Sequence, residues 1–202
     1  MRAANKPNSR TKPPEQRRDE LMSAAQRLFL EQGVAATTIE QITTGAKVAK
    51  GTFYLYFSSR DEVLAALGER FAQQLLAGIE AAVAEKAPQD WKGKLATWAD
   101  AGVGGYIEAK RLHDIVFYGP RPRSPEGLVD NGVIDHLHGL LQAGIAAKAW
   151  AIDDPRFTAV FLFSGLHGII DDAHLREKRV NRKQLAQKLE RLCCRAVGLA
   201  PD

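Results

Sequence analysis

The sequence predicts an all-α protein with a three-helix helix-turn-helix head at its N-terminus and a larger C-terminal helical domain, about nine helices in all. Three observations support this fold class. Apolar residues recur at helical spacing along most of the chain, proline and glycine separate these segments, and residues 38–57 hold two short helices around a tight connection. We expect a disordered basic arm at residues 1–12, the head at 13–60 and the second domain at 61–202.

The head begins with a helix that Pro13 and Pro14 open and Gly33 ends. In the next helix, residues 38–46, Thr37 or Thr38 is the N-cap, and Glu40 or Gln41 stands where a capping box needs a partner.

A helix of about two turns then runs over residues 48–57. Its apolar residues Val48, Phe53 and Phe57 face inward, and its outward residues are Lys50, Gly51, Thr52, Tyr54 and Tyr56. A helix this short is not stable alone, and presenting hydrogen-bond donors to a DNA major groove is one role for it.

The second domain is predicted to hold helices over residues 61–86, 90–112, 113–118, 125–150, 155–178 and 181–197. Gly102, Gly104 and Gly105 interrupt one of them, each at a cost of about 1 kcal/mol relative to Ala. Such a cost indicates close helix approach, a kink or room for a small molecule. The helix at 155–178 is apolar on most faces and therefore needs cover on nearly all sides.

Residues 48–57, VAKGTFYLYF, resemble the recognition helix of the TetR family of transcriptional repressors, V-S-K-G-T-F-Y-x-Y-F, and Arg60 supplies the basic residue that follows. The first helix and its glycine stop match as well, so the resemblance covers roughly residues 15–65. Two positions depart from the pattern. Lys47 stands where the family has a turn glycine. If φ is positive there, lysine costs about 1 kcal/mol relative to glycine. Ala49 replaces a capping serine.

The resemblance implies a homodimeric DNA-binding regulator, a repressor released from its near-palindromic operator by a small apolar ligand. The DNA contacts that it implies are Thr38, Lys50, Gly51, Thr52, Tyr54, Tyr56 and Arg60. Dimerisation is expected through the helices at 155–178 and 181–197, where Gly165 and Gly168 permit tight crossing. The distribution of charge agrees with DNA binding by the head. Residues 1–60 hold ten Lys/Arg and five Asp/Glu (+5), and residues 61–202 hold eighteen Lys/Arg and nineteen Asp/Glu (−1).

A ligand pocket is expected among the helices of the second domain, with mostly apolar walls and a polar end at His167 or Asp171. Each wall residue is singly more typical of a core position than of a pocket. The candidates are Trp98, Tyr106, Phe117, Tyr118, Leu137, Leu141, Phe161, His167, Ile170 and Asp171.

The alternative is a metal- or redox-responsive regulator. His167, Asp171 and His174 have metal-ligand spacing on one helix. The adjacent Cys193 and Cys194 point about 100° apart on a helix, so one is expected to be buried and the other near the surface. No catalytic motif, cofactor site or apolar run of membrane-spanning length occurs, and the two cysteines suit a reducing cytoplasm.

Overall fold

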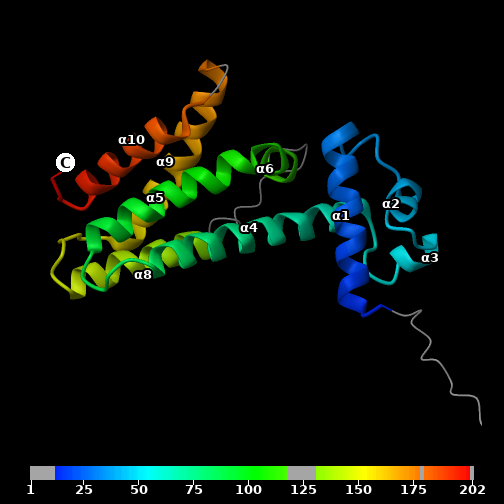
Figure 1. Ribbon diagram of the computed structural model, residues 1–202, viewed down its shortest axis with the longest axis horizontal. Helices are drawn as coiled ribbons and strands as arrows, with labels where there is room; N and C mark the ends of the chain where they lie inside the picture. Colours follow the sequence, from blue (N-terminus) through cyan, green and yellow to red (C-terminus); the bar gives the residue numbers. More distant parts are fainter. Residues whose placement is uncertain (1–11, 118–130, 178–179, 201–202) are drawn as a thin grey trace, which may run out of the picture. The chain divides into compact units, whose positions relative to one another are not determined.

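The computed structural model describes residues 12–117, 131–177 and 180–200, which form helices without strands (Figure 1). The predicted all-α class is confirmed. The arm expected at residues 1–12 lies outside the described residues apart from Lys12. The helices are α1 (Pro14–Gln32), α2 (Ile39–Gly45), α3 (Lys50–Phe53), α4 (Arg60–Ala84), α5 (Trp91–Glu108), α6 (Lys110–Phe117), α8 (Gly132–Ala146), α9 (Pro155–Arg176) and α10 (Arg182–Ala196).

The chain divides into two compact units, which we call the head and the second unit. The head comprises Met1–Gly68 and Asp114–Gly119, and the second unit comprises Glu69–His113 and Pro120–Asp202. The division between these compact units falls inside α4, after Gly68. Both α4 and α6 contribute residues to each unit.

The head is built on α1, which contacts α2, while α2 in turn contacts α3 (Figure 1). One apolar core lies among these helices and the start of α4, and its largest sealed side chains are Leu21, Met22, Phe29, Ile42, Phe53, Phe57 and Leu67. Burial of this core stabilises helices that are too short to form alone.

Local capping explains where the helices begin. Thr38 Oγ1 accepts from the Gln41 N–H at 3.2 Å, and Gln41 Oε1 accepts from the Thr38 N–H at 2.8 Å, which is a complete capping box. Asp154 caps α9, whose first residue is proline, and this start agrees with the predicted helix at 155–178. Gly33 ends α1 with φ 83°, a backbone conformation that favours glycine.

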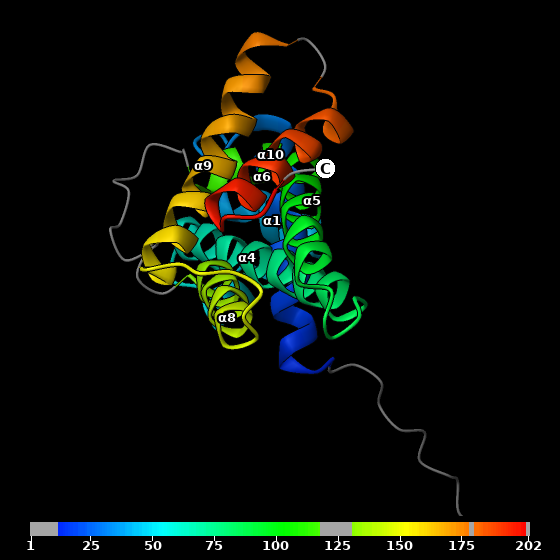
Figure 2. The same cartoon turned by 90° about the vertical axis from the view of Figure 1, so that its left-hand side faces the viewer.

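The second unit packs the C-terminal part of α4 with α5, α8, α9 and α10 around a separate apolar core (Figure 2). The two views agree that α5 and α10 lie side by side. A Cβ at Gly104 would collide with the guanidinium of Arg182 on α10, which is held there by Asp100 at 3.5 Å and Glu108 at 3.3 Å. At Gly104 the absence of a side chain leaves room for the Arg182 guanidinium beside α5.

Three helix bounds differ from prediction by more than two residues. The regular part of α3 is one turn, Lys50–Phe53, although hydrogen bonds from the N–H groups of Tyr56 and Phe57 to the Phe53 carbonyl continue the coil. The break expected at residue 112 occurs at Ala109. The helix predicted to end at Trp150 ends at Ala146, because the chain turns at Lys148 with φ 58°.

In the described residues, no helix has both the length and the apolar character needed to cross a bilayer.

Candidate functional site

The recognition segment, residues 48–57, exposes Lys50 and Tyr54 and is anchored by two phenylalanines. Phe53 is sealed in the head core, with its ring 5.9 Å from that of Phe57. Lys50 and Gly51 are exposed, and Tyr54 exposes 53% of its surface. This arrangement follows from the sequence pattern and leaves a polar surface directly over a rigid core.

Lys50 and Glu40 form an ion pair across the helix-turn-helix, between α3 and α2. The ammonium lowers the pKa of the Glu40 carboxyl, chiefly through their hydrogen bond, and Glu40 raises the pKa of Lys50 in return. Both groups are fully exposed, so the pair contributes little stability. Lys50 therefore stays charged and can exchange Glu40 for another acceptor at small cost.

Gly51 offers an open approach to the helix backbone. Outside its own helix and chain neighbours, no described atom lies within 4 Å of the point where a Cβ would stand. A large partner can therefore come close to α3 at this residue.

The turn between α2 and α3 shows both departures from the family pattern. Lys47 has φ 56°, so the positive φ considered from the sequence is present. The turn is closed by hydrogen bonds from Lys47 N–H to the Thr44 carbonyl (3.1 Å) and from Val48 N–H to the Thr43 carbonyl (2.9 Å). Ala49 is the N-cap of α3, and no side chain of the described residues caps that helix.

Arg60 has a structural role that the sequence did not reveal. Its Nη1 donates to the carbonyl oxygens of Val34 (3.0 Å) and Ala35 (3.2 Å) and to that of Thr37. These carbonyls lie in the loop between α1 and α2, so Arg60 ties the start of α4 to that loop. A basic residue far from the loop in sequence gives no local signal of this contact.

Leu55 and Tyr56 also differ from their sequence interpretation. Tyr56 is half-buried and packs against the head core, although it was expected on the outer face. Leu55, which was not among the predicted contacts, exposes 78% of its surface. Its position beside Tyr54 makes it an apolar element of the same surface.

A polar cluster lies within the second unit, made of Tyr106, Lys110, His113, His167 and Asp171 and called here the effector cluster. Asp171 Oδ1 accepts from the Tyr106 hydroxyl at 3.0 Å and from Lys110 Nζ at 3.1 Å. The Tyr106 ring lies 4.2 Å from that of His113 and 4.8 Å from that of His167. Residues from α5, α6 and α9 thus meet at one place.

Burial affects two polar groups of the second unit, the His167 ring and the Trp98 indole. Loss of solvent lowers the pKa of His167, against the opposing effects of its hydrogen bond with the Phe163 carbonyl and of the Asp171 charge. Trp98 is fully buried, and its Nε1 has no acceptor among the described residues. A buried N–H without an acceptor is costly and calls for a partner.

The predicted pocket residues fall into three groups. Tyr106, His167 and Asp171 belong to the effector cluster, while Trp98, Leu137, Leu141 and Ile170 are sealed in the core of the same unit. Phe117 belongs to the head and is 43% exposed, and Phe161 is 55% exposed on α9. Neither is therefore a wall of the second unit's interior in this structure, and Tyr118 lies outside the described residues.

The metal and redox alternatives are not supported. Among the residues described, no three His, Cys, Asp or Glu side chains form a group suited to a metal. Nδ1 of His174 hydrogen-bonds the Ile170 carbonyl at 2.8 Å, and Asp171 is held by Tyr106 and Lys110.

The expectation that one cysteine would lie near the surface was wrong, because Cys193 and Cys194 are exposed by 0% and 1%. Burial raises the pKa of Cys193 to about 12, so its thiol stays protonated and unreactive.

Comparison with known proteins identifies the head. A model of the bacterial regulatory proteins of the tetR family matches residues 21–67, which include α2, the turn and α3. This part of the chain is similar to the DNA-binding head of the TetR family. Members of this family are transcriptional regulators rather than enzymes.

Curated transcriptional regulators match the chain over a quarter to about a third of its length. The transcriptional regulator HbdR of Aromatoleum sp. (strain CIB) is 50% identical over 50 residues, or 25% of this chain and 22% of the relative. The repressor KstR2 of Mycobacterium tuberculosis is 38% identical over 61 residues, or 30% of each chain. The matches thus span less than a third of these relatives' length.

Solved structures of two bacterial regulators share the fold over nearly the whole chain. FadR from Bacillus subtilis, in complex with stearoyl-CoA, has a TM-score of 0.74 at 21% identity and covers 89% of this chain and 98% of its own. The fatty acid degradation regulator FadR from Bacillus halodurans has a TM-score of 0.74 at 22% identity, with coverage of 96% and 100%. At these identities the likeness establishes the fold.

Proposed function

We propose that the chain is a transcriptional regulator that binds operator DNA in the cytoplasm as a homodimer. The observation that carries this proposal is the exposed surface of Lys50, Gly51 and Tyr54 over the sealed head core. Lys50 and Thr52 contact base edges, while Thr38, Tyr54 and Tyr56 bond phosphates and fix the register. Leu55 adds an apolar contact, suited to a thymine methyl group. Arg60 acts mainly by holding the loop before α2.

The outer face of α9 supports pairing with a second copy of the chain. Phe157 and Phe161 are 68% and 55% exposed and lie one turn apart, and Gly165 and Gly168 follow on the same side. No described atom beyond their own helix and chain neighbours approaches a Cβ site at either glycine. Leu192 of α10 is also exposed, at 39%. An apolar, closely approachable face of this kind suits a helix from a twofold partner.

We further propose that a small molecule with a long apolar part and a polar end binds in the second unit. The apolar core supplies its walls, and the effector cluster and Trp98 Nε1 supply polar contacts. The stearoyl-CoA bound by FadR of B. subtilis has this chemistry and is therefore the first compound to test.

Repression and release require that the ligand favour one state of the protein over another. The helices α4 and α6 are suited to transmit its effect, because each has residues in both units. Lys110 and His113 of α6 belong to the effector cluster, while Ile115 and Val116 pack against the head core.

Fluorescence anisotropy with the full chain and a labelled duplex tests the proposal. The duplex comes from a pool of genomic fragments enriched by the protein. We expect saturable binding of two protomers per site and release on addition of stearoyl-CoA. Absence of sequence-selective binding at any salt concentration would refute the regulator. Selective binding that neither stearoyl-CoA nor other acyl-CoA compounds disturb would refute only the ligand class.

A further inference from the structure

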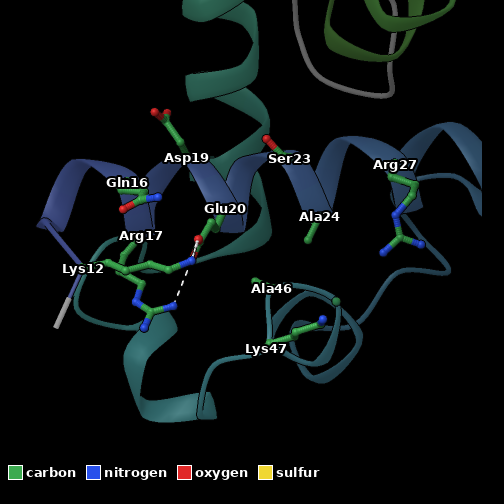
Figure 3. A pocket seen from close by; sticks show the side chains of 11 residues that line it. Lys12, Gln16, Arg17, Asp19, Glu20, Ser23, Ala24, Arg27, Ala46 and Lys47 are labelled. Atoms are coloured by element: carbon green, nitrogen blue, oxygen red, sulfur yellow. Dashed lines mark hydrogen bonds and ion pairs between the residues drawn. The ribbon is translucent and has the colours of Figure 1, made fainter. Parts of the chain in front are cut away.

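A basic cleft of about 560 Å³ lies in the head, between α1 and the turn that joins α2 to α3 (Figure 3). In Figure 3, Lys12, Arg17 and Glu20 gather at the start of α1, and Lys47 projects from the turn beneath Ala46. Four side chains of the lining are cationic and two are acidic; they are Lys12, Arg17, Arg27 and Lys47, with Asp19 and Glu20.

The charges of this cleft are unequally compensated. Glu20 accepts hydrogen bonds from Lys12 and, at 2.9 Å, from Arg17, and these cations lower its pKa, Lys12 most strongly. Arg27 lies 3.9 Å from Glu31. Lys47 Nζ, in contrast, forms no hydrogen bond or ion pair with any described residue. Lys47 therefore places a positive charge in the turn that no carboxylate of the described residues neutralises.

The backbone of Lys47 gives a second, independent observation. With φ 56°, it occupies a conformation that a glycine adopts freely and a lysine adopts only at a cost in free energy. In the described chain, Lys148 is the one other non-glycine residue with positive φ. Strain of this kind, held at an exposed cation three residues before Lys50, is typical of functional positions.

We propose that this cleft binds a phosphate of the DNA backbone, with Lys47 as its principal cation and Lys12 and Arg17 on the facing wall. The proposal rests on the proposed function, namely that the head binds duplex DNA. A phosphate contact at the turn fixes the register of α3 in the groove without recognising sequence. A glycine at position 47 would relieve the backbone strain but would remove the charge that contacts the phosphate.

The test compares Lys47→Gly and Lys47→Asn with the matched control Lys148→Gly, using full chains and an enriched duplex. Asparagine tolerates positive φ but carries no charge. We expect Lys47→Gly and Lys148→Gly each to raise the midpoint of thermal unfolding by about 2–4 °C.

Lys47→Gly and Lys148→Gly are expected to have similar thermal stability, but they should differ in DNA affinity. Each dimer loses two phosphate contacts in the Lys47 variants, so the slope of log K against log[salt] becomes shallower by about 2 and affinity falls about tenfold to a hundredfold near 0.1 M salt. The loss should be equal on specific and unrelated duplexes, and Lys148→Gly should bind like wild type.

The outcomes distinguish the two proposals. If wild type binds DNA but Lys47→Gly and Lys47→Asn keep its affinity and salt slope, the phosphate site is wrong and the regulator stands. A loss of affinity with an unchanged salt slope also overturns the site, because the backbone rather than the charge would be responsible. If wild type binds no duplex, the proposed function itself fails.

Discussion

The candidate site of the head and that of the second unit place their polar groups differently. In the head, Lys50 and Tyr54 stand at the surface over a sealed apolar core, whereas in the second unit Tyr106 and His113 lie inside, exposed by 0% and 4%. A DNA duplex is too large to be enclosed, so the groups that bind it must face outward. A small molecule is bound by enclosure, and its partners must be buried. The location of the polar groups agrees with the proposed partners, a duplex at the head and a small molecule in the second unit.

The strongest test of this contrast is Phe53→Ala. Phe53 is fully buried in the head core and anchors the recognition segment, so its truncation should cost about 3–5 kcal/mol. We expect DNA binding to be lost while the second unit keeps its helices and pairing, as measured by anisotropy, circular dichroism and light scattering. Loss of all helical signal would show instead that the two units fold as one.

Phe161→Asp should break the dimer and leave the fold intact. A carboxylate on the exposed face of α9 would be desolvated by the partner, which should raise the dimer dissociation constant by roughly thirtyfold or more. Sedimentation velocity measures the change, and Gln142→Asp, at an exposed position of α8, is the control. A dimeric Phe161→Asp protein would exclude this face as the interface.

Lys50→Ala and Tyr54→Phe should separate recognition of sequence from contact with the backbone. Lys50→Ala should cost about 1–3 kcal/mol and relax sequence preference, because a base-edge contact is lost. Tyr54→Phe should weaken binding by about 1 kcal/mol on all duplexes. Gel-shift titration on matched and altered sites measures both. Wild-type behaviour of both variants would place DNA binding elsewhere on the molecule.

Glu40→Gln is the matched control for Lys50, since it removes the competing carboxylate and leaves the lysine in place. It should strengthen binding on every duplex.

The smallest effect concerns pH and the second unit. Burial lowers the pKa of His167 below its ordinary value of 6.5, so the unfolded chain takes up a proton at higher pH than the folded one. Its contribution to stability is complete above about pH 6.5 and is lost as pH falls towards the folded pKa. His136 is shifted in the same direction, also by burial. Urea unfolding at several pH values should show a shallower acid dependence in His167→Gln, and an unchanged dependence would assign the effect to other groups.

The sequence predicted what local chemistry decides. The capping box of Thr38, the end of α1 at Gly33 and the start of α9 at Asp154 each depend on residues within a few positions of one another. The sequence could not predict the Arg60 contacts, because they join residues 23 to 26 positions apart.

The burial of both cysteines has the same kind of cause. At Gly198, with φ 79°, the chain turns back so that the Leu199 N–H reaches the Cys194 carbonyl at 2.8 Å. The pattern of α10 alone therefore predicted one buried cysteine, whereas the returning chain end accompanies burial of the second.

The central claim is that two copies of the exposed α3 surface recognise DNA together. Selection from a random duplex pool by the full-length wild-type chain, followed by sequencing, tests it most directly. We predict enrichment of an inverted repeat whose half-sites lie about one or two helical turns apart, with information content reduced in the pool that Lys50→Ala selects. An unenriched pool, or the same motif enriched equally by wild type and Lys50→Ala, would contradict this account.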